Sequence, residues 1–339
     1  MTHLPRFLLL LSAFICVHLP FQTHAAEPIR IGIIGCDTSH VPAFTKLFND
    51  PKAEGDLAGF KVVAAFAGGS PDIPKSSTDR IPKFVEAIKG MGVEMVDSIP
   101  ELLKRVDAVL LESVDGRPHL EQARPVLEAK KLLFIDKPLA GSLADAIAIH
   151  ELAKKHNTPW FSCSSIRFGP KLQALKTDPK IGDVVGATSW SPCSLEEHHP
   201  DLYWYGVHGV EGLYTLMGPG CESVQRTSTP GEDVATGVWA GGRVGIFRGT
   251  RAAKGDYGVV VHGSKGVGAV TGFEGYKPLV EQIGKFFKTG KPPINPEETI
   301  ELFAFMSAAD ESKAKGGAPV KIADVMEKAR AEAAQKVGQ

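Results

Sequence analysis

The sequence has little cysteine, no block of like charges, and no apolar run after its amino-terminal segment that is long enough to cross a membrane. Its 5 cysteines form no C-x-x-C pair, which argues against a zinc module and a disulfide scaffold. The 38 basic and 39 acidic side chains are interspersed, so there is no basic stripe and nucleic acid is not an expected partner. A hydrophobic content of 43% is that of an ordinary globular protein, and 339 residues suggest roughly two domains.

The amino-terminal segment has the three parts of a secretory signal peptide. Arg6 supplies the positive charge, residues 7–17 form a short apolar core, and Ala25 is the small residue before the expected cleavage site. The core is shorter than the roughly 20 residues of a membrane-spanning helix, although a retained anchor is the alternative. We therefore expect residues 1–25 to be removed and the protein to be exported, periplasmic or secreted, with no membrane contact after cleavage. The segment has no twin arginine, which favours export before folding.

Export would place the remaining cysteines in an oxidising compartment, where disulfides can form. Isolated cysteines in a protein of this size are more often buried thiols, and the sequence assigns no pair among them. These residues are Cys36, Cys163, Cys193 and Cys221.

Residues 27–158 alternate short apolar runs with amphipathic stretches. Residues 29–35, IRIGIIG, are rich in β-branched side chains and end in glycine, which is typical of a buried parallel strand. Similar runs occupy residues 61–69, 107–113 and 131–138, and the segments between them have apolar residues at helical spacing. Strands separated by single helices predict a Rossmann-like, doubly wound parallel sheet.

Residues 159–339 have a different pattern. Three stretches between residues 182 and 272 alternate apolar and small polar residues, with glycines at turn positions, which indicates an antiparallel or mixed sheet. Helical patterns follow within residues 278–290 and 296–317. We therefore expect an α/β protein in which the Rossmann-like domain precedes an α+β domain that occupies residues 159–339.

The turn after the first expected strand reads GCDTSH, residues 35–40. A dinucleotide-binding turn has the form G-x-G-x-x-G, whose glycines allow a tight turn, close approach of the diphosphate and helix packing. Only Gly35 matches this form, because Asp37 and His40 take the other two positions. A carboxylate would repel a phosphate oxygen by about 4 kcal/mol at roughly 4 Å and an effective dielectric of about 20. Asp37 is also expected to cap the next helix and to compete with a phosphate for its N–H groups.

The second expected strand ends without the Asp or Glu that binds a ribose 2′-hydroxyl. Ser70, together with Lys75 or Arg80, would instead suit a 2′-phosphate, which favours NADP. A plain glycine turn with solvated charges is the alternative interpretation.

The segment FIDKPLAGS, residues 134–142, brings Asp136 and Lys137 to the carboxyl end of a strand, where open α/β sheets bind ligands. Pro138 permits a cis bond that would fix the backbone of Lys137. A lysine in this place can donate a hydrogen bond to a substrate hydroxyl and hold its charge near a nicotinamide cation. An ordinary surface turn is the alternative.

Residues 196–211 are rich in histidine, aromatic and acidic side chains. His208 and Glu211 are three residues apart and would share a helix face. Histidine is a natural general base for a hydroxyl proton. Structural histidines and a metal bound by His198, His199 and His208 are the alternatives; the spacing matches no zinc motif, so no metal site is predicted.

Four segments, in the same order, resemble the Gfo/Idh/MocA family of oxidoreductases: residues 32–40, 107–140, 207–218 and 286–322. The resemblance covers nearly all of the chain after the signal peptide. It implies a Rossmann domain followed by an open, mostly antiparallel sheet, with the site between them and with sheets that often pair in a homo-oligomer. Members mostly oxidise or reduce sugars and polyols with NAD or NADP.

The resemblance also implies roles for individual residues. Lys137 would be the catalytic lysine and His208 the proton-transferring histidine. The family often has an aspartate four residues before that histidine, where this sequence has Trp204, and Tyr203 or Tyr205 would provide the hydrogen-bonding group instead. The cofactor-binding residues implied in this way are Gly35, Cys36, Asp37, Thr38, Ser39, His40, Ser70, Ser113, Asp136 and Lys137.

The sequence therefore predicts an exported NAD(P)-dependent oxidoreductase that acts on a CH–OH group of a small sugar- or polyol-like substrate. An exported carbohydrate-binding protein without redox activity is an alternative, because the altered fingerprint adjoins an aromatic-rich segment suited to sugar faces. A non-redox sugar lyase or hydrolase is another.

Overall fold

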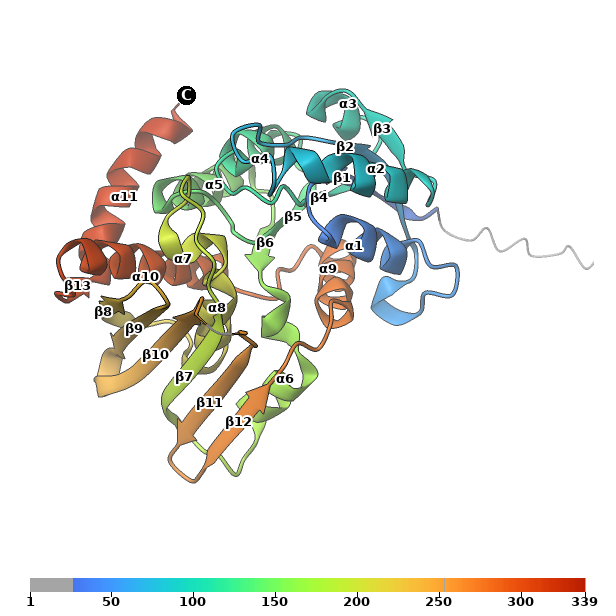
Figure 1. The fold of residues 1–339 in the computed structure, drawn as a ribbon. Coiled ribbons are helices and arrows are strands. Elements are labelled where there is room, and N and C mark those ends of the chain that lie inside the picture. Colours follow the sequence, from blue (N-terminus) through green and yellow to red (C-terminus); the bar gives the residue numbers. More distant parts are fainter. Residues whose placement is uncertain (1–26, 253, 339) are drawn as a thin grey trace, which may run out of the picture.

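The computed structural model describes residues 27–252 and 254–338, so the predicted signal peptide lies outside the described residues. The chain forms two sheets with helices packed around them (Figure 1). The first sheet has six parallel strands in the order β3-β2-β1-β4-β5-β6, which confirms the predicted doubly wound sheet. Its strands are β1 (Ile29–Ile34), β2 (Phe60–Phe66), β3 (Glu94–Val96), β4 (Ala108–Leu111), β5 (Leu132–Asp136) and β6 (Trp160–Cys163).

Helices cover both faces of this sheet. The helices of the described chain are α1 (His40–Phe48), α2 (Ile81–Lys89), α3 (Ile99–Leu103), α4 (His119–Glu128), α5 (Leu143–His156), α6 (Pro170–Thr177), α7 (Asp201–Trp204), α8 (Val207–Met217), α9 (Lys277–Thr289), α10 (Pro296–Ala314) and α11 (Ile322–Val337). Successive residues of β1 and β4 alternate between two hydrophobic clusters, as side chains of a strand must. One cluster includes α1, α2 and α9, and the other includes α3, α4 and α5.

The second sheet has seven strands in the order β12-β11-β7-β10-β9-β8-β13. Only β7 and β10 run parallel, so the expected mostly antiparallel sheet is confirmed. Helices α8 and α10 pack against it and also reach the first domain. Its strands are β7 (Val184–Pro192), β8 (Cys221–Ser228), β9 (Glu232–Trp239), β10 (Arg243–Thr250), β11 (Gly258–Gly263), β12 (Val267–Thr271) and β13 (Val320–Lys321).

The boundary between the two domains differs from the predicted one after residue 158. Strand β6 begins at Trp160 and pairs with β5, so the first sheet extends beyond that boundary. Two later helices also pack on the first domain: α9 lies against η1 (Gly55–Leu57), and α11 lies against α5. Elements from the end of the sequence therefore complete the first domain.

The four cysteines of the described chain are buried and unpaired, as expected for isolated thiols. Within residues 27–252 and 254–338, no helix is both long and apolar enough to cross a membrane.

Candidate active site

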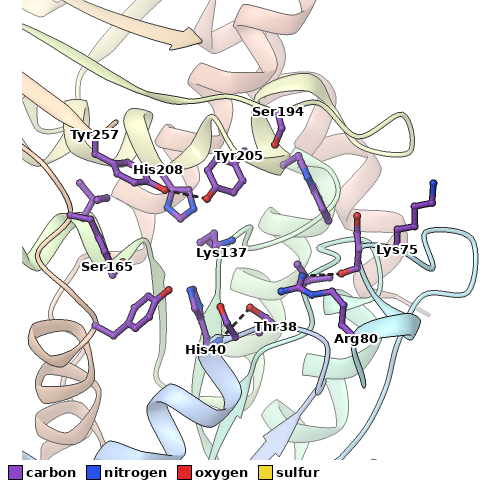
Figure 2. Close-up of a pocket in the computed structure, with 17 residues that line it drawn as sticks. Thr38, His40, Lys75, Arg80, Lys137, Ser165, Ser194, Tyr205, His208 and Tyr257 are labelled. Carbon is purple, nitrogen blue, oxygen red and sulfur yellow. Dashed lines mark hydrogen bonds between the residues drawn. The ribbon is translucent and has the colours of Figure 1, made fainter. Parts of the chain in front are cut away.

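A cavity of about 410 Å³ lies where the carboxyl ends of the first sheet meet α8 and the loops of the second domain. This is the edge at which open α/β sheets bind ligands. Six of the twelve residues predicted to be catalytic or cofactor-binding line the cavity, several of them labelled in Figure 2: Thr38, Ser39, His40, Lys137, Tyr205 and His208. Six others do not line it: Gly35, Cys36, Asp37, Ser70, Ser113 and Asp136.

The tight turn after β1 depends on Gly35. Its φ is +89°, and a methyl group on its α-carbon would overlap the backbone nitrogen of Ser113 at the end of β4. Only glycine meets both conditions, because the left-handed region and the close approach each exclude a side chain. Ser113 itself is buried and donates a hydrogen bond to Gln122 Oε1 at 2.9 Å. Both residues thus shape the turn from behind the cavity wall.

Asp37 faces the protein interior. One carboxylate oxygen accepts a hydrogen bond from Ser77 Oγ at 2.6 Å, and the other accepts one from the backbone nitrogen of Val114 at 2.8 Å. Burial raises the pKa of Asp37, although these hydrogen bonds oppose the shift. Both oxygens are thus used away from α1, so the predicted capping of that helix by Asp37 is wrong. The carboxylate instead ties the turn after β1 to the loop after β2 and to the end of β4.

The cavity wall at the amino end of α1 suits a diphosphate. Thr38 and Ser39 line it; the His40 N–H, the first of α1, donates to Thr38 Oγ1 at 3.4 Å, and the Ser39 side chain caps no N–H of the helix. Lys75 and Arg80, from the loop after β2, line the same cavity. Uncapped helix N–H groups and nearby cations are the usual ligands of phosphate oxygens. The residues present therefore fit the diphosphate of a nicotinamide nucleotide.

Ser70 has a structural role at the end of β2. Its Oγ donates a hydrogen bond to Asp115 Oδ2 at 2.6 Å, and its backbone nitrogen donates one to Ser77 Oγ. Asp115 also binds Arg117, and its other oxygen lies 2.8 Å from Nε2 of His199 in the second domain. Although burial opposes it, hydrogen bonds from His199, Arg117 and Ser70 hold the pKa of Asp115 far below its usual value. Lys75 and Arg80, rather than Ser70, are the loop residues that reach the cavity.

Lys137 follows the last residue of β5 and is largely buried. The Lys137–Pro138 bond is cis, as the sequence allowed. The ammonium lies over the ring of Tyr205, with Nζ 5.8 Å from the ring centroid. The Tyr205 hydroxyl lies 3.2 Å from that of Tyr257. The cation is therefore held at the centre of the cavity by packing, and its N–H groups can meet a ligand oxygen.

His208 enters the cavity from the first turn of α8. Its Nδ1 is 2.7 Å from Ser164 Oγ, which also accepts a hydrogen bond from the backbone nitrogen of Ile166. Burial, followed by the nearby charges of Lys137 and His40, lowers the pKa of His208 well below its usual value. The imidazole is thus neutral near pH 7 and can accept a proton.

Ser164 and Arg167 help to position His208 and were not identified from the sequence. Glu211, one turn along α8, accepts hydrogen bonds from Arg167 Nε and from the backbone nitrogen of Ser164 at 3.1 Å. Arg167 also binds Glu298 of α10 at 2.7 Å. Ser164 and Arg167 lie in the SCSSIRFG segment after β6, which has no motif signal, so only the fold brings them to α8.

Cys36 was predicted to bind the cofactor, and a metal bound by His198, His199 and His208 was given as an alternative. Cys36 is buried, and burial, with the charges of Glu112 and Asp37, raises the pKa of its thiol to about 12. In the described part of the chain, one group of side chains has metal-ligand spacing: Glu196, Glu197 and His198, on the loop before α7. His199 and His208 are not members of that group.

The comparisons with known proteins agree with this geometry. Residues 29–162 match the family model described as "Oxidoreductase family, NAD-binding Rossmann fold", the Gfo/Idh/MocA model. No curated protein matches the sequence significantly.

Solved structures show the same fold over most of the chain. A probable dehydrogenase from Thermotoga maritima has 21% identity and a TM-score of 0.71, covering 88% of this chain and 100% of its own. A putative myo-inositol dehydrogenase from Sinorhizobium meliloti has 17% identity and a TM-score of 0.71, with 87% and 99% covered. Scyllo-inositol dehydrogenase from Lactobacillus casei, solved with NAD(H) and scyllo-inositol, has 16% identity and a TM-score of 0.71, with 88% and 100% covered.

The matched residues include the Gly35 turn, the loop with Lys75 and Arg80, and Lys137. The class of cofactor predicted from the sequence, a nicotinamide nucleotide, is thereby confirmed for this domain. Residues 29–162 of this chain thus match the Gfo/Idh/MocA family of NAD-binding oxidoreductases, the family that the sequence resembles.

Proposed function

We propose that this chain is an NAD(P)-dependent oxidoreductase that interconverts a secondary alcohol and a ketone on a polyol- or sugar-like substrate. The observation that carries the proposal is the convergence of Lys137 and His208, from different domains, on one cavity that begins at the dinucleotide-type turn. A cation for the substrate oxygen and a neutral imidazole for its proton are what alcohol oxidation requires of the protein.

Lys137 orients the substrate oxygen. Its ammonium donates a hydrogen bond to the hydroxyl that loses its proton, and its charge stabilises the developing alkoxide. Tyr205 limits where the ammonium can move, because Nζ lies over the ring face. A nicotinamide bound in this cavity would supply the hydride acceptor for the substrate carbon that carries this oxygen.

His208 takes the hydroxyl proton. Ser164 Oγ already accepts the Ile166 N–H and can accept the Nδ1–H of His208 with its remaining lone pair. That arrangement leaves Nε2 as the proton-accepting atom. Burial keeps the imidazole neutral before the reaction, so the base is ready at neutral pH.

The walls of the cavity suit a ring with many hydroxyl groups. Trp204, Tyr205, Tyr257, Phe273 and Tyr276 provide apolar faces, and serine, lysine and histidine side chains provide hydrogen bonds. Sugars and cyclic polyols present an apolar C–H face and polar edges to such a site. The inositol dehydrogenases among the similar structures support this substrate class.

Turnover of polyols with NAD or NADP tests the proposal. The absorbance of reduced nicotinamide is followed with myo-inositol, scyllo-inositol and common aldoses. Lys137→Met should lower kcat by a factor of about 100 or more, because the positioned donor to the alkoxide is lost. Lys265→Met, at an exposed lysine outside the cavity, is the matched control and should retain full activity. Equal turnover by the wild type and Lys137→Met would rule out the assigned role.

The aromatic residues that line the cavity also suit a second candidate function, that of a carbohydrate-binding protein without redox activity. Calorimetry separates the two functions. Polyol binding of equal strength with and without nucleotide, and without turnover, favours the binding protein. Binding that strengthens with nucleotide and leads to turnover favours the oxidoreductase.

We also infer that the protein is exported, to the periplasm or beyond, on the strength of the signal-peptide pattern in residues 1–25. Expression of the full chain followed by amino-terminal sequencing of the exported fraction tests this. A mature protein that begins at Ala26 is the expected result, and an uncleaved chain confined to the cytoplasm would contradict it.

A further inference from the structure

A second histidine faces the cavity and has no part in the hydride step. His40 is the first residue of α1, at the position where the dinucleotide fingerprint has its third glycine. It lines the same cavity as Lys137 and His208. In Figure 2, His40 points from the amino end of α1 toward Lys137, and His208 lies beyond Lys137.

The imidazole of His40 is held in a fixed orientation. Its Nδ1 lies 2.7 Å from Asp136 Oδ2, in a pair that is almost completely buried. The ring of Phe44 stacks on it with centroids 5.3 Å apart, and Tyr276 meets it edge-on at 4.7 Å. The carboxylate behind the ring engages one nitrogen and thereby fixes the direction in which the other nitrogen points.

Asp136 keeps its negative charge despite its burial. Although burial opposes it, the neighbouring His40, through its hydrogen bond, and the charge of Lys137 hold the pKa of Asp136 below its usual value. An ionised carboxylate accepts the Nδ1–H of His40, so Nε2 is the atom left to exchange protons with the cavity. A histidine oriented in this way by a carboxylate is the arrangement of a general acid–base group.

The two histidines of the cavity have different surroundings. His40 is backed by a carboxylate, whereas His208 is backed by a hydroxyl and has no anionic partner among the described residues. Lys137 lies between them (Figure 2). A ligand whose oxygen is bound to the ammonium can therefore meet one imidazole at that oxygen and the other at a neighbouring atom.

We propose that His40 is a second catalytic acid–base residue, which exchanges the hydrogen on the carbon next to the carbonyl of a polyhydroxy ketone. Nε2 removes that proton, the C–H electron pair moves into the C=C bond of an enolate, and the enolate oxygen is held by Lys137. Reprotonation from the imidazolium returns the ketone, so no oxidant or reductant is consumed. The ligand class rests on the proposed function, because the ketone is the product of the alcohol oxidation.

Hydrogen exchange measured without any nucleotide tests the proposal. The full chain is incubated with 2-keto-myo-inositol in D₂O, and the proton NMR signals next to the carbonyl are followed. The wild type should exchange these hydrogens well above the buffer rate. His40→Asn should lower the enzymatic rate by a factor of about 100 or more, the usual contribution of a positioned acid–base group. His262→Asn, at an exposed histidine on β11, should leave the rate unchanged.

Chemical rescue separates catalysis from a structural role. His40→Gly restores the glycine of the fingerprint and leaves room for a free imidazole beside Asp136. Added imidazole should restore part of the exchange in His40→Gly and none in the double variant His40→Gly/Asp136→Asn, which lacks the carboxylate that orients the ring. Exchange that is lost in His40→Gly and does not respond to imidazole would contradict the proposal.

The outcomes distinguish this inference from the proposed function. Exchange that depends on His40 in a protein that oxidises no polyol would leave the inference standing and overturn the oxidoreductase. Polyol oxidation with exchange at the buffer rate, or with exchange unaffected by His40→Asn, would overturn the inference alone. Neither activity would overturn both.

Discussion

Both histidines that line the cavity are held from behind by a residue that does not line it. His40 is backed by Asp136, and His208 is backed by Ser164. Such support fixes the direction of the reactive nitrogen before a ligand arrives, which lowers the cost of reaching the reactive geometry. At the scale of single residues, the site is therefore preorganised by buried partners.

Replacing Asp37 tests whether its carboxylate repels a phosphate. Asp37→Gly restores the second glycine of the fingerprint, but it leaves Ser77 Oγ and the Val114 N–H without their acceptor. We expect the free energy of unfolding to fall by about 1–3 kcal/mol, and the affinity for NAD to stay unchanged. Urea unfolding and calorimetry measure the two quantities.

Ser77→Ala is the matched control, because it removes one of the two hydrogen bonds and keeps the carboxylate. It should destabilise the protein less than Asp37→Gly. A tenfold gain in NAD affinity in Asp37→Gly would show that the carboxylate does act on the diphosphate, contrary to its inward orientation.

Glu112, directly after β4, makes stability depend on pH. It is fully buried, and both carboxylate oxygens lack a hydrogen-bond partner among the described residues. Burial, and then the charges of Asp136 and Asp37, raise its pKa well above the usual value. The folded protein therefore keeps this proton at a pH where the unfolded chain has lost it. Stability from this group is full below the unfolded pKa and is lost as pH rises toward the folded one.

Glu112→Gln removes this dependence. Above about pH 4.3, where an unfolded glutamate ionises, the variant should be more stable than the wild type. The difference should grow by at most about 1.4 kcal/mol per pH unit. Urea unfolding at several values between about pH 5 and 8 measures it. Parallel stability curves for the two proteins would mean that Glu112 is ionised in the folded state.

At the scale of elements, α8, the helix that carries His208, packs closely against the second sheet. A methyl group on Gly209 would overlap the ring of Phe247 on β10, whereas one on Gly212 would lie 3.2 Å from Val259 Cγ1. The first contact forces a displacement of the helix, and the second needs only a small adjustment. The position of the proposed base thus depends on the residue next to it.

Gly209→Ala should therefore lower the free energy of unfolding by about 1–3 kcal/mol and reduce turnover as well, because His208 moves with α8. Gly212→Ala is the control. The small steric cost of its added methyl group is offset by the helix propensity of alanine, which is about 1 kcal/mol more favourable than that of glycine. Thermal unfolding and kcat measure both effects. Equal behaviour of the two variants would contradict the close packing at Gly209.

Elements with a strong local pattern could be predicted from the sequence. The run IRIGIIG and its glycine predicted β1 and the tight turn, and the spacing of His208 and Glu211 predicted their common helix face. The direction of Asp37 could not be predicted, because its partners lie 40 and 77 residues away. Ser164 and Arg167 were missed for the same reason: their role depends on contacts with α8 that only the fold creates.

At the scale of the whole molecule, the cavity depends on the way the chain returns to its first domain. Helix α9 contributes Leu279, Val280 and Ile283 to the hydrophobic cluster that covers one face of the first sheet. On α11, Lys336 pairs with Asp145 of α5 at 2.6 Å. The second domain is thus attached at both faces of the first, which holds His208 opposite Lys137. No local pattern in residues 277–337 indicates that α9 and α11 pack on the first domain.

The central claim is that the cavity holds a nicotinamide nucleotide although the fingerprint keeps only its first glycine. Calorimetric titration of the nucleotide-free protein with NAD and with NADP tests it most directly. We predict micromolar or tighter binding of at least one, weakened by Lys75→Met, because Lys75 is one of the cations that line the cavity. No binding at millimolar nucleotide would contradict the account and leave Lys137 and His208 as contacts of a ligand that is not oxidised.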